Sequence, residues 1–228
     1  MPDSSAIRTE PIQVRRTALV ASFGPEPGPA VRGLWYVLHG QAMGAVEILH
    51  MAHALDDGTR LVIAPEALNR HYVGPAVSRD APTGATWLTR AERAWDIADT
   101  TAYLDSLHAR VRESFAGALP PVTVVGFSQG GGVAVRWVAG GNIHPERLAI
   151  WAASAPPEVD WRALVAREPQ MRISYVCGTR DKYLTPKVLD AQHAILREAG
   201  VEFEAVSFDG GHRLDDDTLR RLAASRAD

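Results

Sequence analysis

Two kinds of segment alternate along the chain: short runs of β-branched and other apolar residues, and longer segments in which apolar residues recur every three or four positions. Runs of the first kind predict strands, and segments of the second kind predict helices. Leu34–Leu38, Val122–Phe127 and Leu148–Ala152 are almost continuously apolar, which is typical of strands that helices cover on both faces. We predict strands at Ile12–Val14, Ala18–Ser22, Leu34–Leu38, Leu61–Ala64, Val122–Phe127, Leu148–Ala152, Ile173–Cys177 and Phe203–Phe208.

The helical segments lie between these strands. The longest, Thr89–Phe115, has an apolar stripe at helical spacing, and Thr89 with Glu92 three residues later predicts a capping box at its start. The other predicted helices are Gly44–Leu55, Gln129–Ala139, Trp161–Ala166, Pro186–Ala199 and Asp215–Ala224. This alternation favours an α/β fold in one domain over residues 1–228, with a mostly parallel sheet of about eight strands and helices on both faces.

Three connections refine this prediction. The first two runs, Ile12–Val14 and Ala18–Ser22, are mixed in polarity and close together, so we expect an antiparallel hairpin at an edge of the sheet. The stretch Pro65–Leu88 has no clear periodicity and is long for a connection, which predicts a functional loop. The connection from Ala152 to Arg172 has room for one small helix, so we expect no large cap domain.

Composition excludes several classes of protein. With 46% hydrophobic and 22% charged residues, the chain is neither disordered nor fibrous. Its 24 basic and 27 acidic residues argue against a nucleic-acid partner. A single cysteine, Cys177, excludes an internal disulfide and a cysteine-rich zinc site. Met1–Arg16 lacks the apolar core of a secretory signal and no apolar run is long enough to span a membrane, so we expect a cytoplasmic protein.

The most specific local signal is Gly126-Phe127-Ser128-Gln129-Gly130, a match to G-x-S-x-G. It lies between a predicted strand and a predicted helix, which is the setting of a nucleophile elbow. The residues two before and two after the serine come close together in such a turn, so both must be small, as Gly126 and Gly130 are. The alternative is a mononucleotide-binding loop, but no G-K-[ST] follows and no acidic ribose partner is obvious.

A serine hydroxyl becomes a good nucleophile when a base takes its proton and a third group orients that base. The histidines after Ser128 are His144, His193 and His212. His144 precedes a proline in a loop, and His193 falls inside a predicted helix. His212 directly follows the last predicted strand, in the turn Asp209-Gly210-Gly211-His212, so we predict that it is the base.

The candidate acid is Asp181, which comes directly after the predicted strand Ile173–Cys177. It completes the chain order serine, acid, histidine that accompanies a nucleophile elbow. Asp209, three residues before His212, is a rival acid, although its position at a strand end is typical of a residue that caps a turn.

A tetrahedral intermediate also needs hydrogen-bond donors for its oxyanion. One should be the backbone N–H of Gln129, directly after the serine. The other should come from the loop after Leu34–Leu38, where the backbone N–H of Gln41 is the best candidate. His39 in the same loop precedes the serine, so we expect it to order the loop.

With these residues in place, the chain resembles the α/β-hydrolase superfamily, and more narrowly its phospholipase/carboxylesterase branch, which includes acyl-protein thioesterases. The resemblance implies the α/β-hydrolase fold and a serine hydrolase that cleaves small carboxylic esters or thioesters, with Ser128, Asp181 and His212 as triad and with no cofactor or metal. One departure is that many members have a second glycine in the loop after His-Gly, where this chain has Ala42. The matching pieces are Leu38-His39-Gly40, Gly126–Gly130, Gly178-Thr179-Arg180-Asp181 with Pro186, and Gly210-Gly211-His212.

We expect the substrate pocket to come from Pro65–Leu88, with Tyr72 and Trp87 as the aromatic residues near the site, unless they serve in packing alone. The short connection after Leu148–Ala152 implies an open site without a large lid, and thus no interfacial activation on lipid aggregates. Two alternatives to hydrolysis remain: acyl transfer by the same triad, and a non-catalytic binding protein that keeps the fold.

Overall fold

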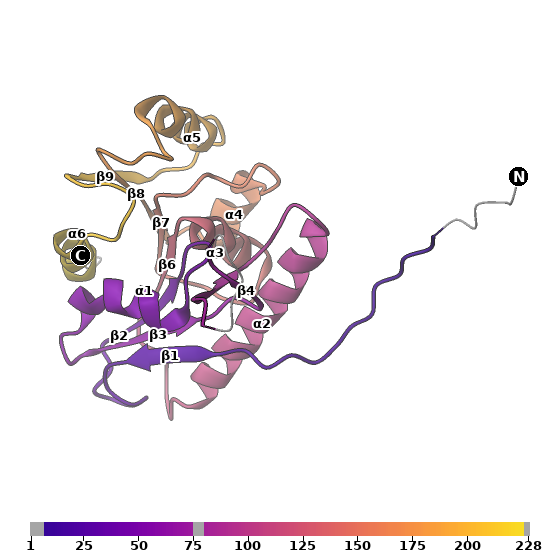
Figure 1. The fold of residues 1–228 in the computed structure, drawn as a ribbon. Helices are drawn as coiled ribbons and strands as arrows, with labels where there is room; N and C mark the ends of the chain where they lie inside the picture. The colour runs from indigo at the N-terminus through magenta and orange to yellow at the C-terminus, as the bar shows by residue number, and fades with distance from the viewer. Residues whose placement is uncertain (1–6, 75–79, 226–228) are drawn as a thin grey trace, which may run out of the picture.

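A seven-stranded sheet forms the centre of the computed structural model, which describes residues 7–74 and 80–225 (Figure 1). The strand order is β1-β3-β2-β6-β7-β8-β9, and every neighbouring pair is parallel except β1 with β3. The predicted mostly parallel sheet is therefore confirmed. The strands are β1 Val20–Phe23, β2 Gly33–Leu38, β3 Arg60–Pro65, β6 Val122–Phe127, β7 Arg147–Trp151, β8 Arg172–Gly178 and β9 Glu204–Phe208.

Helices cover both faces of this sheet. Along β2 the side chains alternate between two cores: Leu34 and Tyr36 pack in the core beneath α2 to α5, whereas Trp35 and Val37 pack in the core beneath α1 and α6. Only the short α4 lies between β7 and β8, so there is no large cap in this fully described connection. The helices are α1 Ala45–Met51, α2 Arg93–Glu113, α3 Gln129–Gly140, α4 Trp161–Arg167, α5 Pro186–Glu198 and α6 Asp216–Ala224, with a 3-10 turn at His53–Leu55.

The predicted N-terminal hairpin is wrong. Ile12–Val14 forms no strand, and its two apolar side chains are 76% and 79% exposed. The chain before β1 leads away from the sheet, so this short run lies beside no strand of the described structure (Figure 1). The antiparallel edge exists, but β1 forms it with β3, with Val20 opposite Pro65 and Phe23 opposite Val62.

The segment Pro65–Leu88 is not simply a loop. It contains a separate two-stranded antiparallel sheet, β4 (Asn69–Tyr72) with β5 (Thr83–Thr86), while residues 75–79 lie outside the described chain. Both strands are short and mostly polar, so they produce no alternation of apolar and polar residues. An isolated bridge between Met43 and Ala85 joins this hairpin to the loop after β2.

The predicted capping box at Thr89 is also wrong. The helix begins at Arg93 because Glu92 has a left-handed backbone, with φ of +50°. The Thr89 hydroxyl donates to the Ala91 carbonyl, and the Thr89 N–H donates to the Asp96 carboxylate at 2.9 Å. Asp96, from the first turn of α2, therefore orders this segment. Within the described part of the chain, no helix has the length and apolar character required to cross a membrane.

The first turn of α3 packs directly against the backbone of two strands. A Cβ built on Gly130 would lie 2.4 Å from the Leu38 carbonyl oxygen, and one built on Gly126 would lie 2.3 Å from the Gly130 carbonyl oxygen. Both contacts are with main-chain atoms, which cannot move aside as a flexible side chain can. The two glycines therefore set how closely α3 approaches the ends of β2 and β6.

We expect Gly130→Ala to lower the free energy of unfolding by roughly 3 kcal/mol, because its methyl group would overlap the backbone of β2. Gly140 is the matched control at the other end of α3, since nothing lies within 4 Å of a Cβ built there. Gly140→Ala should raise stability by about 0.5 kcal/mol through the loss of chain entropy in the unfolded state. Urea unfolding of both variants measures the contrast, and equal stabilities would contradict the proposed packing constraint.

Candidate active site

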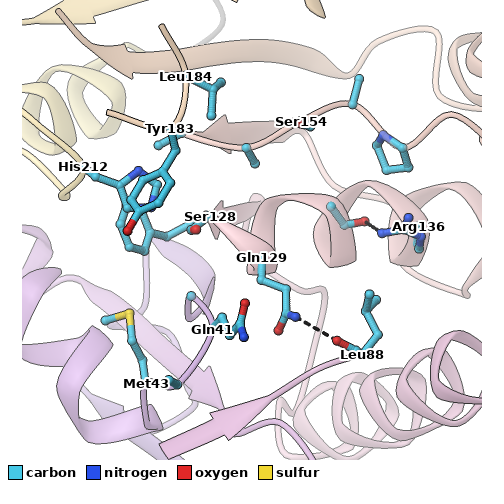
Figure 2. Close-up of a pocket in the computed structure, with 18 of the residues that line it drawn as sticks. Gln41, Met43, Leu88, Ser128, Gln129, Arg136, Ser154, Tyr183, Leu184 and His212 are labelled. Carbon is cyan, nitrogen blue, oxygen red and sulfur yellow. Dashed lines mark hydrogen bonds between the residues drawn. The ribbon is translucent and has the colours of Figure 1, made fainter. Parts of the chain in front are cut away.

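Three of the predicted residues follow the carboxyl ends of strands on one edge of the sheet. Ser128 comes directly after β6, Asp181 follows β8 and His212 follows β9. The carboxyl ends of parallel strands form the edge at which such folds place their ligands. Ser128 and His212 line the same pocket, where Figure 2 shows them side by side.

The backbone at Ser128 is strained in the way a nucleophile elbow requires. Its φ of +53° and ψ of −120° lie in a region that residues with a side chain rarely adopt. The Ser128 N–H donates to the Trp151 carbonyl at 2.8 Å, and the Gly131 N–H donates to the Ser128 carbonyl at 2.9 Å. These bonds on either side of the turn hold the hydroxyl at the pocket.

Asp181 and His212 form a partly buried hydrogen bond. The Asp181 side chain is fully buried, and its Oδ2 accepts from Nδ1 of His212 at 2.8 Å. Its Oδ1 accepts the backbone N–H groups of Tyr183 and Leu184 at 2.8 and 3.0 Å. Burial by itself would raise the pKa of Asp181, but these donors hold it below its usual value. The carboxylate is therefore charged, and it accepts a proton-bearing nitrogen from His212.

This bond determines what the imidazole can do. Since the carboxylate can only accept, Nδ1 of neutral His212 carries the proton and Nε2 is free to act as a base. The ring is held between Phe127 and Tyr183, with centroid separations of 4.9 and 4.6 Å. Asp209, the rival acid, is 80% exposed at its side chain and forms an ion pair with Arg180 instead.

Gln41 and Gln129, the predicted oxyanion donors, both line the pocket beside Ser128. The side chain of Gln129 has a further role that the sequence did not reveal. Its Oε1 accepts the Trp87 N–H at 2.8 Å and the Thr86 hydroxyl at 2.9 Å, and its Nε2 donates to the Leu88 carbonyl at 2.9 Å (Figure 2). The residue after the serine thus ties the end of β5 to α3.

His39 orders the loop that carries Gln41. Its ring is fully buried, Nδ1 donates to the Gly40 carbonyl at 2.7 Å, and Nε2 accepts the Ala67 N–H at 3.0 Å. Burial lowers the pKa of His39, which favours the neutral ring that this pattern needs. The next turn of the loop is fixed by Ala42, whose φ is +61° and whose N–H donates to Ala85.

Tyr72 and Trp87, predicted at the substrate pocket, are not among the residues that line it. Trp87 is 1% exposed and packs on His39, and its Nε1–H donates to the His39 carbonyl at 2.8 Å. Tyr72 lies on the hairpin strand β4 and is 49% exposed. The aromatic residues that line the pocket are Phe127, directly before Ser128, and Tyr183, two positions after Asp181. Their places beside two of the predicted site residues could have indicated this.

The pocket has a volume of about 710 Å³ and lies between the turn at Ser128 and the loop after β7. Arg93 from the start of α2 and Arg136 from α3 also line it, and sequence reasoning missed both. Among residues 7–74 and 80–225, no group of three His, Cys, Asp or Glu side chains could hold a metal ion. The lining residues are Gly40, Gln41, Ala42, Met43, Leu88, Arg93, Phe127, Ser128, Gln129, Gly132, Arg136, Ala152, Ala153, Ser154, Ala155, Pro156, Pro157, Tyr183, Leu184 and His212.

Comparison with known proteins supports the fold but does not establish a reaction. No protein-family model matches the chain, and no curated protein sequence matches it significantly. Solved structures do match over almost the whole chain. The esterase PE8 has a TM-score of 0.62 at 18% identity, covering 92% of this chain and 97% of its own. Acyl-protein thioesterase 2 from Zea mays has a TM-score of 0.64 at 15% identity, covering 91% and 99%.

A phospholipase/carboxylesterase from Dyadobacter fermentans is similar to the same extent, with a TM-score of 0.60 at 13% identity over 92% of this chain and 96% of its own. At such identities the likeness concerns the fold alone. The α/β-hydrolase fold predicted from the sequence is thereby confirmed, with seven strands in its main sheet and two in the separate hairpin.

The buried His39 predicts a pH dependence of stability. Its folded pKa is lowered below the unfolded value of about 6.5, so the unfolded chain takes up a proton first as the pH falls. Stability should therefore decline below pH ~6.5, and His39→Gln should make this decline shallower. Urea unfolding at neutral and mildly acidic pH measures it. His50→Gln, at an exposed position on α1, should follow the wild type, and an identical decline in the His39 variant would contradict the assignment.

Proposed function

We propose that this protein is a serine hydrolase that cleaves carboxylic esters or thioesters through an acyl-enzyme intermediate. The observation that carries the proposal is the 2.8 Å hydrogen bond between buried Asp181 and His212, in the same site as Ser128 on its strained turn. A charged carboxylate, an oriented imidazole and a hydroxyl at a pocket are the parts that nucleophilic catalysis needs. The esterases and thioesterases that share the fold support the same class of chemistry.

In the proposed first half-reaction, Ser128 Oγ attacks the acyl carbonyl carbon while Nε2 of His212 takes the hydroxyl proton. Asp181 stabilises the imidazolium that forms, and the backbone N–H groups of Gln41 and Gln129 donate to the oxyanion. The intermediate then collapses: the bond from the carbonyl carbon to the leaving oxygen or sulfur breaks, and His212 gives its proton to the leaving group. The acyl group remains on Ser128.

In the second half-reaction, water attacks the acyl-enzyme. His212 takes a proton from the water and returns it to Ser128 Oγ as the ester bond to the enzyme breaks. The fully described connection between β7 and β8 contains only the short α4 and covers the pocket with no large cap, which supports access of water and hydrolysis of a small-molecule substrate. No step in this sequence requires a cofactor or a metal.

Replacing the nucleophile tests the proposal most directly. Ser128→Ala should lower kcat for a short p-nitrophenyl ester by roughly 10³-fold or more, because no other group can form the acyl-enzyme. It should also abolish labelling by a fluorophosphonate probe. Ser106→Ala, on the exposed face of α2, is the control and should keep full activity. A Ser128→Ala variant that keeps most of its activity would contradict the proposal.

The two candidate acids give a second test. Asp181→Asn should lower kcat by roughly 10³- to 10⁴-fold, because an amide stabilises neither the required tautomer nor the imidazolium. Asp209→Asn, which removes a surface ion pair with Arg180 and weakens an exposed contact with Thr179, should change kcat less than twofold on the scale of such exposed pairs. Steady-state kinetics on the same ester measures both variants. The reverse result would make Asp209 the acid.

A further inference from the structure

The two ends of the pocket differ in character. Ser128, His212 and Tyr183 lie at one end, and Arg93 and Arg136 line the other. Figure 2 shows His212 and Arg136 on opposite sides, with Ser128 and Gln129 between them. Among the described residues that line the pocket there is no Asp or Glu, so the arginine end is positively charged.

Arg136 reaches the pocket because of its place on α3. Gln129, Gly132 and Arg136 are spaced by three and four residues, so they share one face of the helix, and all three line the pocket. The guanidinium folds back by one turn, where NH1 donates to the Gly132 carbonyl at 2.9 Å. Gly132 follows Ser128 by four residues, or about 6 Å along the helix axis, and its carbonyl points toward the C-terminal end of α3, so the guanidinium lies farther from Ser128 than this.

Glycine at position 132 keeps this charge open to the pocket. A Cβ built on Gly132 would lie 3.0 Å from NH1 of Arg136, closer than most real contacts of this kind. A larger residue there would stand between the guanidinium and the pocket. The helix therefore has a gap where a ligand atom can approach the cation.

The charges at this end do not balance. Glu158, which is not among the lining residues, contacts Arg136 through Oε1 at 2.6 to 2.7 Å, and the same oxygen lies 4.0 Å from NH2 of Arg93. One carboxylate thus faces two guanidiniums. The ion pair with Glu158 explains why Arg136 is tolerated at a position where its side chain is 8% exposed, but it leaves one positive charge beside the pocket.

The proposed chemistry assigns the two ends to the two parts of an ester. His212 returns a proton to the leaving group, so the alcohol or thiol departs at the His212 end. The acyl chain, bonded to Ser128, then extends toward Arg93 and Arg136. A carboxylate at the end of that chain would pair with the uncompensated guanidinium, and the bidentate fork of arginine matches a carboxylate.

We propose, on the basis of the hydrolase function above, that the preferred substrates are half-esters or half-thioesters of short dicarboxylic acids, whose free carboxylate binds Arg93 and Arg136. The products are then a dicarboxylic acid and an alcohol or thiol. Because the guanidinium lies more than one helical turn from Ser128, an acyl chain several carbons long, such as adipyl, is needed to reach it.

The test compares two substrates with the same leaving group, mono-p-nitrophenyl adipate and p-nitrophenyl hexanoate. The wild type should favour the adipate by about tenfold in kcat/KM, the contribution of a charge-assisted hydrogen bond. Arg136→Gln should reduce this ratio about tenfold, and Arg93→Gln, at a more exposed side chain, about threefold. Salt at about 1 M should also reduce it, because ions screen the attraction.

Two controls address charge and folding. Arg112→Gln removes the same charge from the far, exposed end of α2 and should leave the ratio unchanged. Arg136→Gln leaves Glu158 without its main partner, so the double variant with Glu158→Gln removes both charges together. If neither variant folds, as judged by circular dichroism, Arg93→Gln and the salt dependence decide the question.

Calorimetry separates this proposal from the hydrolase function itself. Monomethyl adipate should bind to the Ser128→Ala protein, and adding Arg93→Gln should weaken that binding about threefold. If the wild type cleaves neither ester, the proposed function fails and this binding still decides the anion site. The anion site is overturned if the wild type has equal kcat/KM for the hexanoate and the adipate, or if both arginine variants lower kcat/KM for the two esters equally. It is also overturned if p-carboxyphenyl hexanoate, whose anion is on the leaving group, has the higher kcat/KM instead.

Discussion

The close approach of α3 to the ends of β2 and β6 controls most of the geometry around the pocket. Gly130 lies against the carbonyls of Leu38 and His39, and Gly126 lies against Gly130. At this separation the chain must reverse within one residue, which accounts for the positive φ of Ser128. The same contact brings the side chain of Gln129 to the end of β5 and the loop after β2 to the serine. Strain at one residue is thus maintained by backbone packing on both sides of it.

Electrostatics then divides the pocket. At one end the carboxylate of Asp181 is buried, accepts three hydrogen bonds and is held ionised next to an imidazole. At the other end a largely buried guanidinium shares one carboxylate with a second arginine. The first charge is fully compensated by protein donors and serves to orient His212. The second is not fully compensated by the protein, and this difference is why we assign a ligand to it.

Sequence reasoning reached the parts of this site that depend on local order along the chain. A strand, a tight turn and a helix around Ser128 follow from the apolar run and the paired glycines, and residues directly after parallel strands must share one edge of the sheet. It failed where partners come from elsewhere in the fold. The β4–β5 hairpin is held partly by a glutamine side chain from α3, Trp87 is buried against His39, and the pocket combines arginines from α2 and α3. No periodicity within a single segment carries that information. At Ile12–Val14 the error was of the other kind, an element predicted where none forms. Two apolar residues suggested a strand, but both side chains are exposed in the described structure.

Gln129 also limits how the specificity of this protein could be redesigned. Its backbone borders the serine, while its amide is bonded to Thr86, Trp87 and Leu88 at the end of the hairpin. Grafting a different hairpin into this position would remove those partners and leave a partly buried amide to reorient beside Ser128. Among the residues that the structure describes, no hydrogen bond links Arg93 or Arg136 to the hairpin. Loop exchange between proteins of this fold is therefore constrained at one side of the pocket, and point substitution at the other side is the more independent route to new substrates.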